Sequence, residues 1–215
     1  MRVRYWRRRF ARHAILGVTS VFGAASVGLL FPERPSAFRL SMGTAYVSLG
    51  LLTMTLLLGP WNVLRGRANP LSTDLRRDVG IWAAVVAFVH IVFGLQVHLS
   101  GAMEQYFLWA PESGHLLPFR YDVPGLANYA GLASGLVLLM LLAVSNDAAL
   151  RRLGPARWKG LQRWNYAGFA LMGVHAVLYQ SIEQRSGPWM LVMGGSLTVV
   201  VATQIAGWRR RSEAL

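Results

Sequence analysis

Six long apolar runs restrict the fold of this 215-residue chain more than any other feature of its sequence. A hydrocarbon layer about 30 Å thick requires roughly 20 apolar residues, because an α-helix rises about 1.5 Å per residue. We therefore predict an all-α, polytopic membrane bundle that forms a single transmembrane domain over residues 1–215. The six predicted transmembrane helices cover residues 14–31, 40–61, 79–99, 126–144, 164–182 and 188–208.

Positive charge gathers in alternate segments between the runs. The chain has 22 Lys and Arg residues and a formal net charge of +13. Lys and Arg are dense before the first run, after the second, after the fourth and at the C-terminus. Cytoplasmic loops of membrane proteins carry such an excess, so we expect both termini in the cytoplasm. The pattern predicts a multi-pass membrane protein, in contact with membrane lipid and with no nucleic-acid partner.

The absence of cysteine excludes several kinds of redox centre. Without cysteine the chain has no disulfide, iron–sulfur cluster, thiolate metal site or covalent haem attachment through Cys-x-x-Cys-His. No glycine-rich dinucleotide loop follows a predicted strand, and no stretch is long enough for a separate flavin or nicotinamide domain. A haem in this protein must therefore be held by non-covalent ligands.

Two histidines lie inside apolar runs, where ionisable side chains are costly and usually functional. His90 follows Arg77 by thirteen residues, and His175 follows Gln162 by thirteen. Both imidazoles are thus expected about 20 Å from the cytoplasmic edge, on helices that run in the same direction. Two such imidazoles suit axial ligation of a haem iron, His90 and His175 being its metal ligands. The alternative is that each one only forms a hydrogen bond to a neighbouring helix.

Other residues near these histidines support lesser expectations. Gly94 and Gly168 lie one and two turns from the two histidines and would leave flat space for a porphyrin, although small residues also serve ordinary helix packing. We expect His98 to be an interfacial polar residue, with proton handling as the lesser alternative. We expect His13 and His115 to be solvated.

Two loop segments before these histidines carry a recognisable pattern. They read NPL…LRRDVGIW over residues 69–82 and SND…LRRLG…WKGLQRWNY over residues 145–166. These segments resemble the ferric reductase-like transmembrane family and, within it, the haem-binding subunits of bacterial methionine sulfoxide reductase systems. The resemblance extends from the second to the sixth apolar run, and His90 and His175 match the family's haem-ligand positions.

The resemblance implies a b-type cytochrome of the bacterial inner membrane that serves as the electron-transfer subunit of an oxidoreductase system. Its donor would be the quinone pool, as quinol, or a cytoplasmic flavin reductase. Its acceptor would be a periplasmic molybdopterin oxidoreductase that repairs oxidised methionine. The chain itself would supply no catalytic residue, because substrate chemistry belongs to the partner.

The chain departs from the family pattern at one important position. The family usually reads Trp-x-x-Leu-His-Arg where this chain has Gln162 in place of histidine. Since an amide ligates haem iron poorly, we expect one haem b, with the second either absent or ligated differently. Arg77, Gln162 and Arg163 are candidate inner-site contacts for haem propionates or an FMN phosphate. Positive-inside anchoring explains the arginines equally well.

Two alternative functions remain open at the level of sequence. A metalloreductase would reduce ferric iron at the outer surface, where the loop of residues 100–124 carries Glu104, Glu112, His115 and Asp122. A non-redox transporter or assembly factor would use the intramembrane histidines for helix contacts or proton relay.

Overall fold

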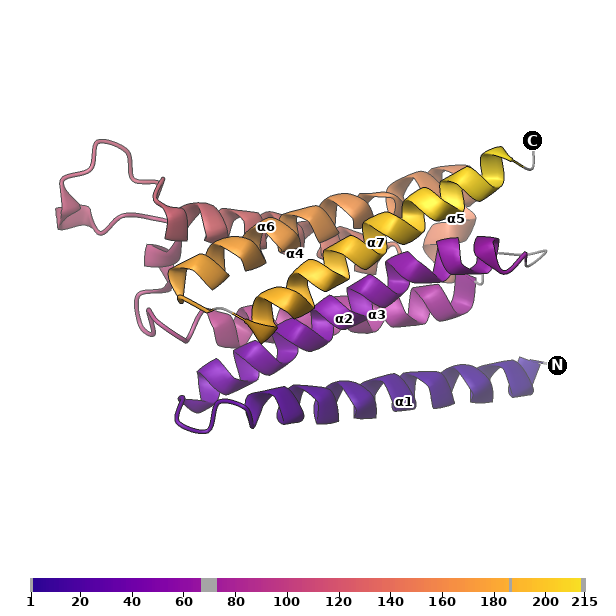
Figure 1. Cartoon of the computed structure of the whole chain (residues 1–215), viewed down its shortest axis with the longest axis horizontal. Helices are drawn as coiled ribbons and strands as arrows, with labels where there is room; N and C mark the ends of the chain where they lie inside the picture. Colours follow the sequence, from indigo (N-terminus) through magenta and orange to yellow (C-terminus); the bar gives the residue numbers. More distant parts are fainter. Residues whose placement is uncertain (1, 67–72, 186, 214–215) are drawn as a thin grey trace. The chain divides into compact units, whose positions relative to one another are not determined.

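The chain is helical in a computed structural model that describes residues 2–66, 73–185 and 187–213. Within these residues no β-strand forms, and an isolated antiparallel bridge joins Leu108 to Phe119. The elements, shown in Figure 1, are α1 (Arg2–Gly28), α2 (Ser36–Leu64), α3 (Thr73–Gly94), the 3₁₀ turns η1 (Met103–Tyr106) and η2 (Pro111–Ser113), α4 (Val123–Ala143), α5 (Asp147–Gln162), α6 (Trp164–Ile182) and α7 (Pro188–Ser212).

Five of these helices, namely α1, α2, α3, α4 and α7, are long and apolar enough to cross a membrane. This confirms the prediction of an all-α, multi-pass membrane protein. The fifth predicted span coincides with α6, which is not among the five. Its 19 residues include Asn165, His175 and Gln180, which lower its mean hydropathy. The count of six spans and the cytoplasmic termini stay predictions.

Several predicted boundaries were wrong by a few residues. The third helix ends at Gly94 instead of residue 99, and residues 95–97 form a turn after it. The first begins at Arg2 and ends at Gly28, because the arginine-rich segment is itself compatible with a helix. The segment treated as a loop after residue 144 is largely α5, which bends at Gly154, where φ is 74°.

The structure forms two compact units, which we describe separately. The first contains residues 1–94 and 200–215, so it holds α1, α2, α3 and the end of α7. Its centre is fully buried at Leu56, Val79 and Ala83. Helices α1 and α2 approach closely, since a Cβ atom at Gly43 would lie 2.1 Å from the carbonyl oxygen of Ala24. Such contacts between small residues are usual where membrane helices pack.

The second unit contains residues 95–199, with α4, α5, α6 and the start of α7. Helix α4 packs on α6, where the Ser134 hydroxyl donates to the carbonyl oxygen of Gly168 at 2.9 Å. The Trp158 indole donates to the carbonyl oxygen of Val144 at 2.9 Å and ties α5 to the end of α4. The long loop before α4 extends past the ends of α4 and α6 (Figure 1).

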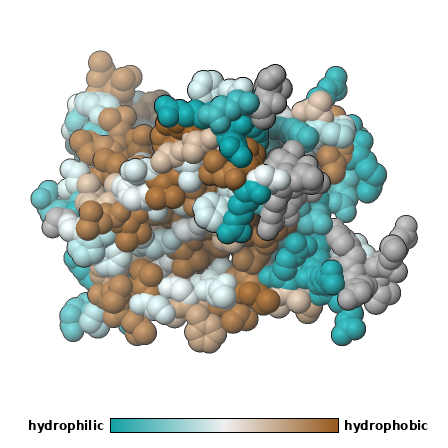
Figure 2. Space-filling model, turned by 45° about the vertical axis from the view of Figure 1, so that its right-hand side comes forward, coloured by the Kyte–Doolittle hydropathy of each residue, from teal (hydrophilic) through white to brown (hydrophobic). Residues whose placement is uncertain are grey.

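Much of the helical surface is apolar, as expected for contact with lipid. Hydrophobic residues form broad patches in Figure 2, and many hydrophilic residues gather near the margins. Phe22 on α1 and Leu191 on α7 are 69% and 74% exposed. Exposure of large apolar side chains on this scale fits a hydrocarbon environment better than water.

Candidate functional site

His90 is held by the neighbouring helix α2 within the first unit. Its Nδ1 atom lies 2.9 Å from the carbonyl oxygen of Ser41 and 3.2 Å from the Ser41 hydroxyl. A carbonyl oxygen only accepts hydrogen bonds, so the proton of a neutral His90 ring is on Nδ1. The lone pair is then on Nε2, the nitrogen able to coordinate a metal.

His175 has the same arrangement within the second unit. Its Nδ1 atom lies 2.8 Å from the carbonyl oxygen of Ala127 on α4. The same argument puts the ring proton on Nδ1 and the lone pair on Nε2. The ring of Tyr179, one turn further along α6, lies 4.8 Å from the imidazole, centre to centre.

Both candidate ligands are therefore set in the tautomer that axial ligation requires. Metal-bound histidines almost always donate their second ring N–H to a carbonyl, a carboxylate or water, which orients the ring. The hydrogen bonds to neighbouring helices engage Nδ1, so they are compatible with coordination through Nε2. The donor chemistry of His90 and His175 thus fits a haem, and their pairing on one iron stays a prediction.

The two glycines expected to leave space for a porphyrin differ in their surroundings. A Cβ atom at Gly94 would lie 3.5 Å from the Ser41 hydroxyl and 3.8 Å from Cε1 of His90, which are ordinary contacts. At Gly168 it would lie 3.1 Å from Cγ1 of Val137 on α4. Gly168 therefore serves the packing of α6 on α4, and the expectation of flat space at this position was wrong.

A polar network that sequence reasoning missed surrounds the C-terminal end of α6. Tyr179 donates to Oδ1 of Asn128 at 2.6 Å, and Nδ2 of Asn128 donates to the carbonyl oxygen of Tyr106 at 2.9 Å. The Tyr106 hydroxyl accepts from the backbone N–H groups of His98 and Leu99 at 3.0 and 3.3 Å. The buried Asn128 inside an apolar run was the available sequence signal, since such a group needs partners.

His98 is paired rather than simply solvated. Its Nε2 atom lies 2.7 Å from Oε1 of Glu183, and Arg185 lies 3.7 Å from the second oxygen of the same carboxylate. The His98 side chain is 47% exposed, and its position at the membrane interface stays a prediction.

The long loop before α4 is organised around an aromatic cluster. The His115 ring stacks on Trp109 with centroids 3.9 Å apart, and its Nδ1 atom lies 2.9 Å from the Tyr121 hydroxyl. His115 is exposed, as expected. Arg120 lies over Trp109 and pairs with Asp122, which caps α4 by accepting from the N–H group of Gly125. The hydrogen bond from Arg120 lowers the pKa of the Asp122 carboxyl and raises that of the guanidinium.

A buried carboxylate joins α1 to α3 in the first unit. Asp78 is fully buried and contacts Arg9 and Arg12, each at 3.2 Å. The Trp82 indole donates to Nδ1 of His13 at 3.1 Å, while Nε2 of His13 lies 3.4 Å from Asp78. The expectation that His13 is simply solvated was wrong, because the packing of α1 on α3 brings it to Asp78 and Trp82.

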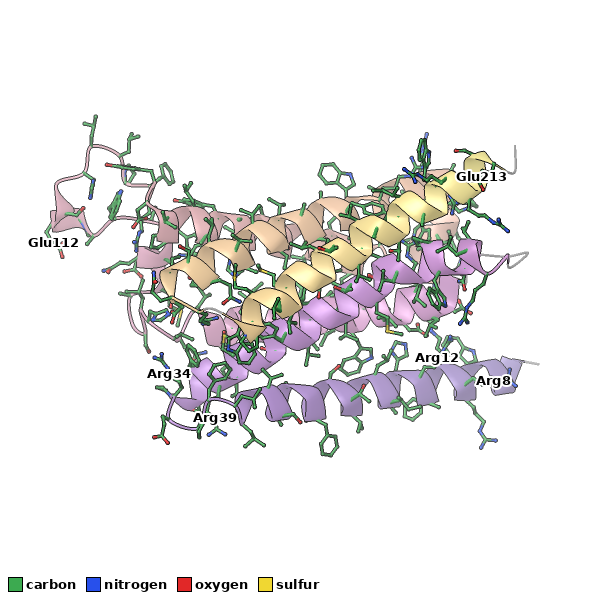
Figure 3. All side chains as sticks on the ribbon, in the orientation of Figure 1. Arg8, Arg12, Arg34, Arg39, Glu112 and Glu213 are labelled. Carbon is green, nitrogen blue, oxygen red and sulfur yellow. The ribbon has the colours of Figure 1, made fainter. Side chains whose placement is uncertain are left out.

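Arginines lie toward both ends of α1. Figure 3 shows Arg8 and Arg12 near its N-terminal end, and Arg34 and Arg39 near the turn into α2. Arg39 donates from Nε to the carbonyl oxygen of Gly28 at 3.1 Å, so it satisfies an end group of α1.

The candidate inner-site residues have individual contacts but no geometry that identifies a cofactor. Arg77 lies 3.9 Å from Asp74, and its side chain is 7% exposed. Gln162 ends α5 with its Nε2 atom buried and without a hydrogen-bond acceptor among the described residues. Arg163 is exposed at the junction of α5 and α6. Among the residues that the structure describes, no three His, Cys, Asp or Glu side chains gather as a metal site.

Comparisons with known proteins find distant relatives. No protein-family model matches the chain. The protein-methionine-sulfoxide reductase heme-binding subunit MsrQ of Rhodospirillum rubrum is 28% identical over 194 residues, which is 89% of this chain and 84% of MsrQ. The magnetosome protein MamZ of Magnetospirillum gryphiswaldense is 26% identical over 134 residues. That match covers 62% of this chain and 18% of MamZ, so the chain spans less than a fifth of the length of MamZ. The similarity to MsrQ over most of both chains supports a distant MsrQ-like relationship.

Proposed function

We propose that this chain is a b-type cytochrome of the ferric reductase-like kind, which passes electrons across the bacterial inner membrane to a periplasmic acceptor. The observation that carries the proposal is the shared tautomer of His90 and His175. Each donates from Nδ1 to a backbone carbonyl of a neighbouring helix, which leaves the imidazole lone pair on Nε2, the nitrogen that would ligate iron. The similarity to a protein named as a heme-binding subunit supports the same function.

In this proposal His90 and His175 would hold one haem b by ligating its iron through Nε2. The haem would supply one-electron transfer, and the protein would supply ligation, orientation and insulation from water. The carbonyl groups of Ser41 and Ala127 fix the two ring orientations and increase the electron density on Nε2. Both ligand helices would then act as rigid supports, which a redox centre needs in order to keep its geometry in both oxidation states.

We further propose that the electron donor is quinol or a flavin bound within the membrane. Gln162 replaces the histidine expected for a second haem near the cytoplasmic side, and a single haem about 20 Å from that side would receive electrons slowly from a cytoplasmic donor. FMN would be the cofactor of the flavin donor. Arg77 and Arg163 would meet the propionates of a haem or the phosphate of FMN, with Gln162 as a neutral hydrogen-bonding neighbour. A periplasmic molybdopterin oxidoreductase that reduces methionine sulfoxide is the proposed acceptor.

The test is a reduced-minus-oxidised absorption spectrum of the detergent-purified protein, with haem quantified per chain as the pyridine haemochrome. We expect one b-type haem per chain in the natural protein and in His98→Ala, a control histidine outside the proposed ligand pair. We expect none in His90→Ala or His175→Ala. Absence of haem from the natural protein after expression with ample haem would overturn the proposal and favour a non-redox role. Full occupancy in either ligand variant would remove that residue from the site.

A further inference from the structure

Helix α4 contacts the imidazole of His175 at two positions, which lie one helical turn apart. Ala127 contributes its carbonyl oxygen, which accepts from Nδ1 at 2.8 Å. At Gly131, a Cβ atom would lie 2.6 Å from Nδ1, 2.9 Å from Cε1 and 3.3 Å from Cγ of the same ring. Positions separated by four residues lie on the same face of a helix, so the Ala127 carbonyl and the backbone of Gly131 both face this imidazole.

We propose that Gly131 is a positioning residue for His175, because the lack of a side chain there keeps the space that the imidazole fills. This inference rests on the proposed function, since it assigns Gly131 a role toward a haem ligand. Two of the three distances lie below 3.0 Å, which is closer than non-bonded carbon and nitrogen atoms approach. An alanine at this position therefore requires the ring or one of the helices to move.

The ring, and not the helices, is expected to yield. One turn further along α4, Ser134 bonds to the carbonyl oxygen of Gly168 on α6, and Val137 packs where a Gly168 Cβ would be. These contacts keep the two backbones close together. A rotated imidazole would lose its hydrogen bond to the Ala127 carbonyl and turn Nε2 away from its present direction. The substitution should therefore weaken iron ligation by His175.

The surroundings of Gly131 differ from those of a glycine that only allows helices to approach. The three nearest atoms to its would-be Cβ all belong to the His175 ring. At Gly43, by contrast, the corresponding atoms are backbone atoms of Ala24. At Gly94, the would-be Cβ is 3.8 Å from His90 and makes only ordinary contacts. The steric restriction is therefore specific to the His175 ligand.

The experiment measures haem content and the low-spin spectrum of the full-length Gly131→Ala protein. Gly50→Ala is the matched control, because nothing lies within 4 Å of a Cβ at that mid-helix position. Loss of an orienting contact around a metal ligand typically lowers metal affinity about 10-fold or more. We therefore expect Gly131→Ala to bind haem about 10-fold more weakly and to contain less low-spin haem per chain than the natural protein. The control should keep the natural haem content. Natural haem content and an unchanged low-spin spectrum in Gly131→Ala would overturn the inference.

A second measurement does not depend on haem. Thermal unfolding of the haem-free protein is compared for Gly131→Ala, His175→Ala and the double variant. If Gly131 makes space for the imidazole, alanine there lowers the melting temperature only while His175 is present. An equal loss in both backgrounds would indicate ordinary helix packing and overturn the inference. If Gly131→Ala alone does not fold, recovery in the double variant supports the inference, and failure to recover overturns it.

The two tests separate this inference from the proposed function. If the natural protein contains no haem, the proposed function is wrong. Non-additive melting temperatures of the variants at positions 131 and 175 would still show that Gly131 makes space for the imidazole of His175. A natural protein with haem, combined with a neutral Gly131→Ala substitution, defeats the positioning role and leaves the proposed function intact.

Discussion

The carboxylate of Asp78 on α3 is fully buried and accepts a hydrogen bond from Nε of Arg9 on α1 at 3.2 Å. A buried charge is costly unless it is paired, and removal of one partner leaves the other uncompensated. Arg12 contacts the second oxygen of the carboxylate, also at 3.2 Å. The position of α1 against α3 therefore depends on this carboxylate.

Asp78→Asn should destabilise the protein by about 3 kcal/mol, because it leaves the Arg9 guanidinium without its buried counter-charge. Thermal unfolding in detergent measures the effect. Asp74→Asn is the matched control on the same helix, since Asp74 is 41% exposed and lies 3.9 Å from its arginine. The control should change stability by less than about 1 kcal/mol. Equal losses in the two variants would contradict a structural role for the buried pair.

Ser41→Ala should retain haem, in contrast to His90→Ala. The substitution removes the hydroxyl 3.2 Å from Nδ1 but leaves the backbone carbonyl at 2.9 Å, which alone determines the tautomer. The loss of one hydrogen bond should cost about 1 kcal/mol of stability. The pyridine haemochrome assay and a melting curve check both expectations. Loss of haem from Ser41→Ala would show that the hydroxyl, and not the carbonyl, orients the ring.

Tyr179→Phe should destabilise the C-terminal end of α6 by about 1 kcal/mol while leaving haem bound. The variant lacks the hydroxyl that donates to Oδ1 of buried Asn128 at 2.6 Å, so the amide loses a partner. A double-mutant cycle with Asn128→Leu, followed by thermal unfolding, measures the coupling between the two side chains. Additive effects in that cycle would argue against the hydrogen bond.

The long loop before α4 should become less stable in acid because of Asp122. The hydrogen bond from Arg120 lowers the pKa of the Asp122 carboxyl in the folded state, so folding favours the ionised form. This contribution is fully present above the ordinary carboxyl pKa, near 4, and is lost as pH falls through the lowered value. Hydrogen exchange of residues 103–126 as a function of pH measures the loss.

Asp122→Ala is the test variant for this acid dependence. It should remove that part of the pH profile and cost about 1 kcal/mol, because the N-cap of α4 is lost. Glu112→Gln is a control in the same loop, since Glu112 is exposed. An unchanged pH profile in Asp122→Ala would assign the acid sensitivity to another group.

The sequence by itself determined the helical, membrane-spanning class of this protein and its two principal candidate ligands. A bilayer requires helices of about 20 apolar residues, so the class can be recognised from local composition. His90 and His175 stand out because ionisable residues within apolar runs are costly. The helix boundaries were less accurate, and the bend in α5 at Gly154 was missed, because termini depend on local capping and turn conformations.

Only the tertiary structure decided how these residues are held. The tautomers of His90 and His175 depend on carbonyl groups 49 and 48 residues away in sequence. The role of Gly131 depends on a ring brought to it by another helix, and nothing in its own apolar run distinguishes it. His13 likewise acquires its partners from α3. Hydrogen-bond direction and steric fit are properties of atoms from distant segments, so local composition determines the helices but not their contacts.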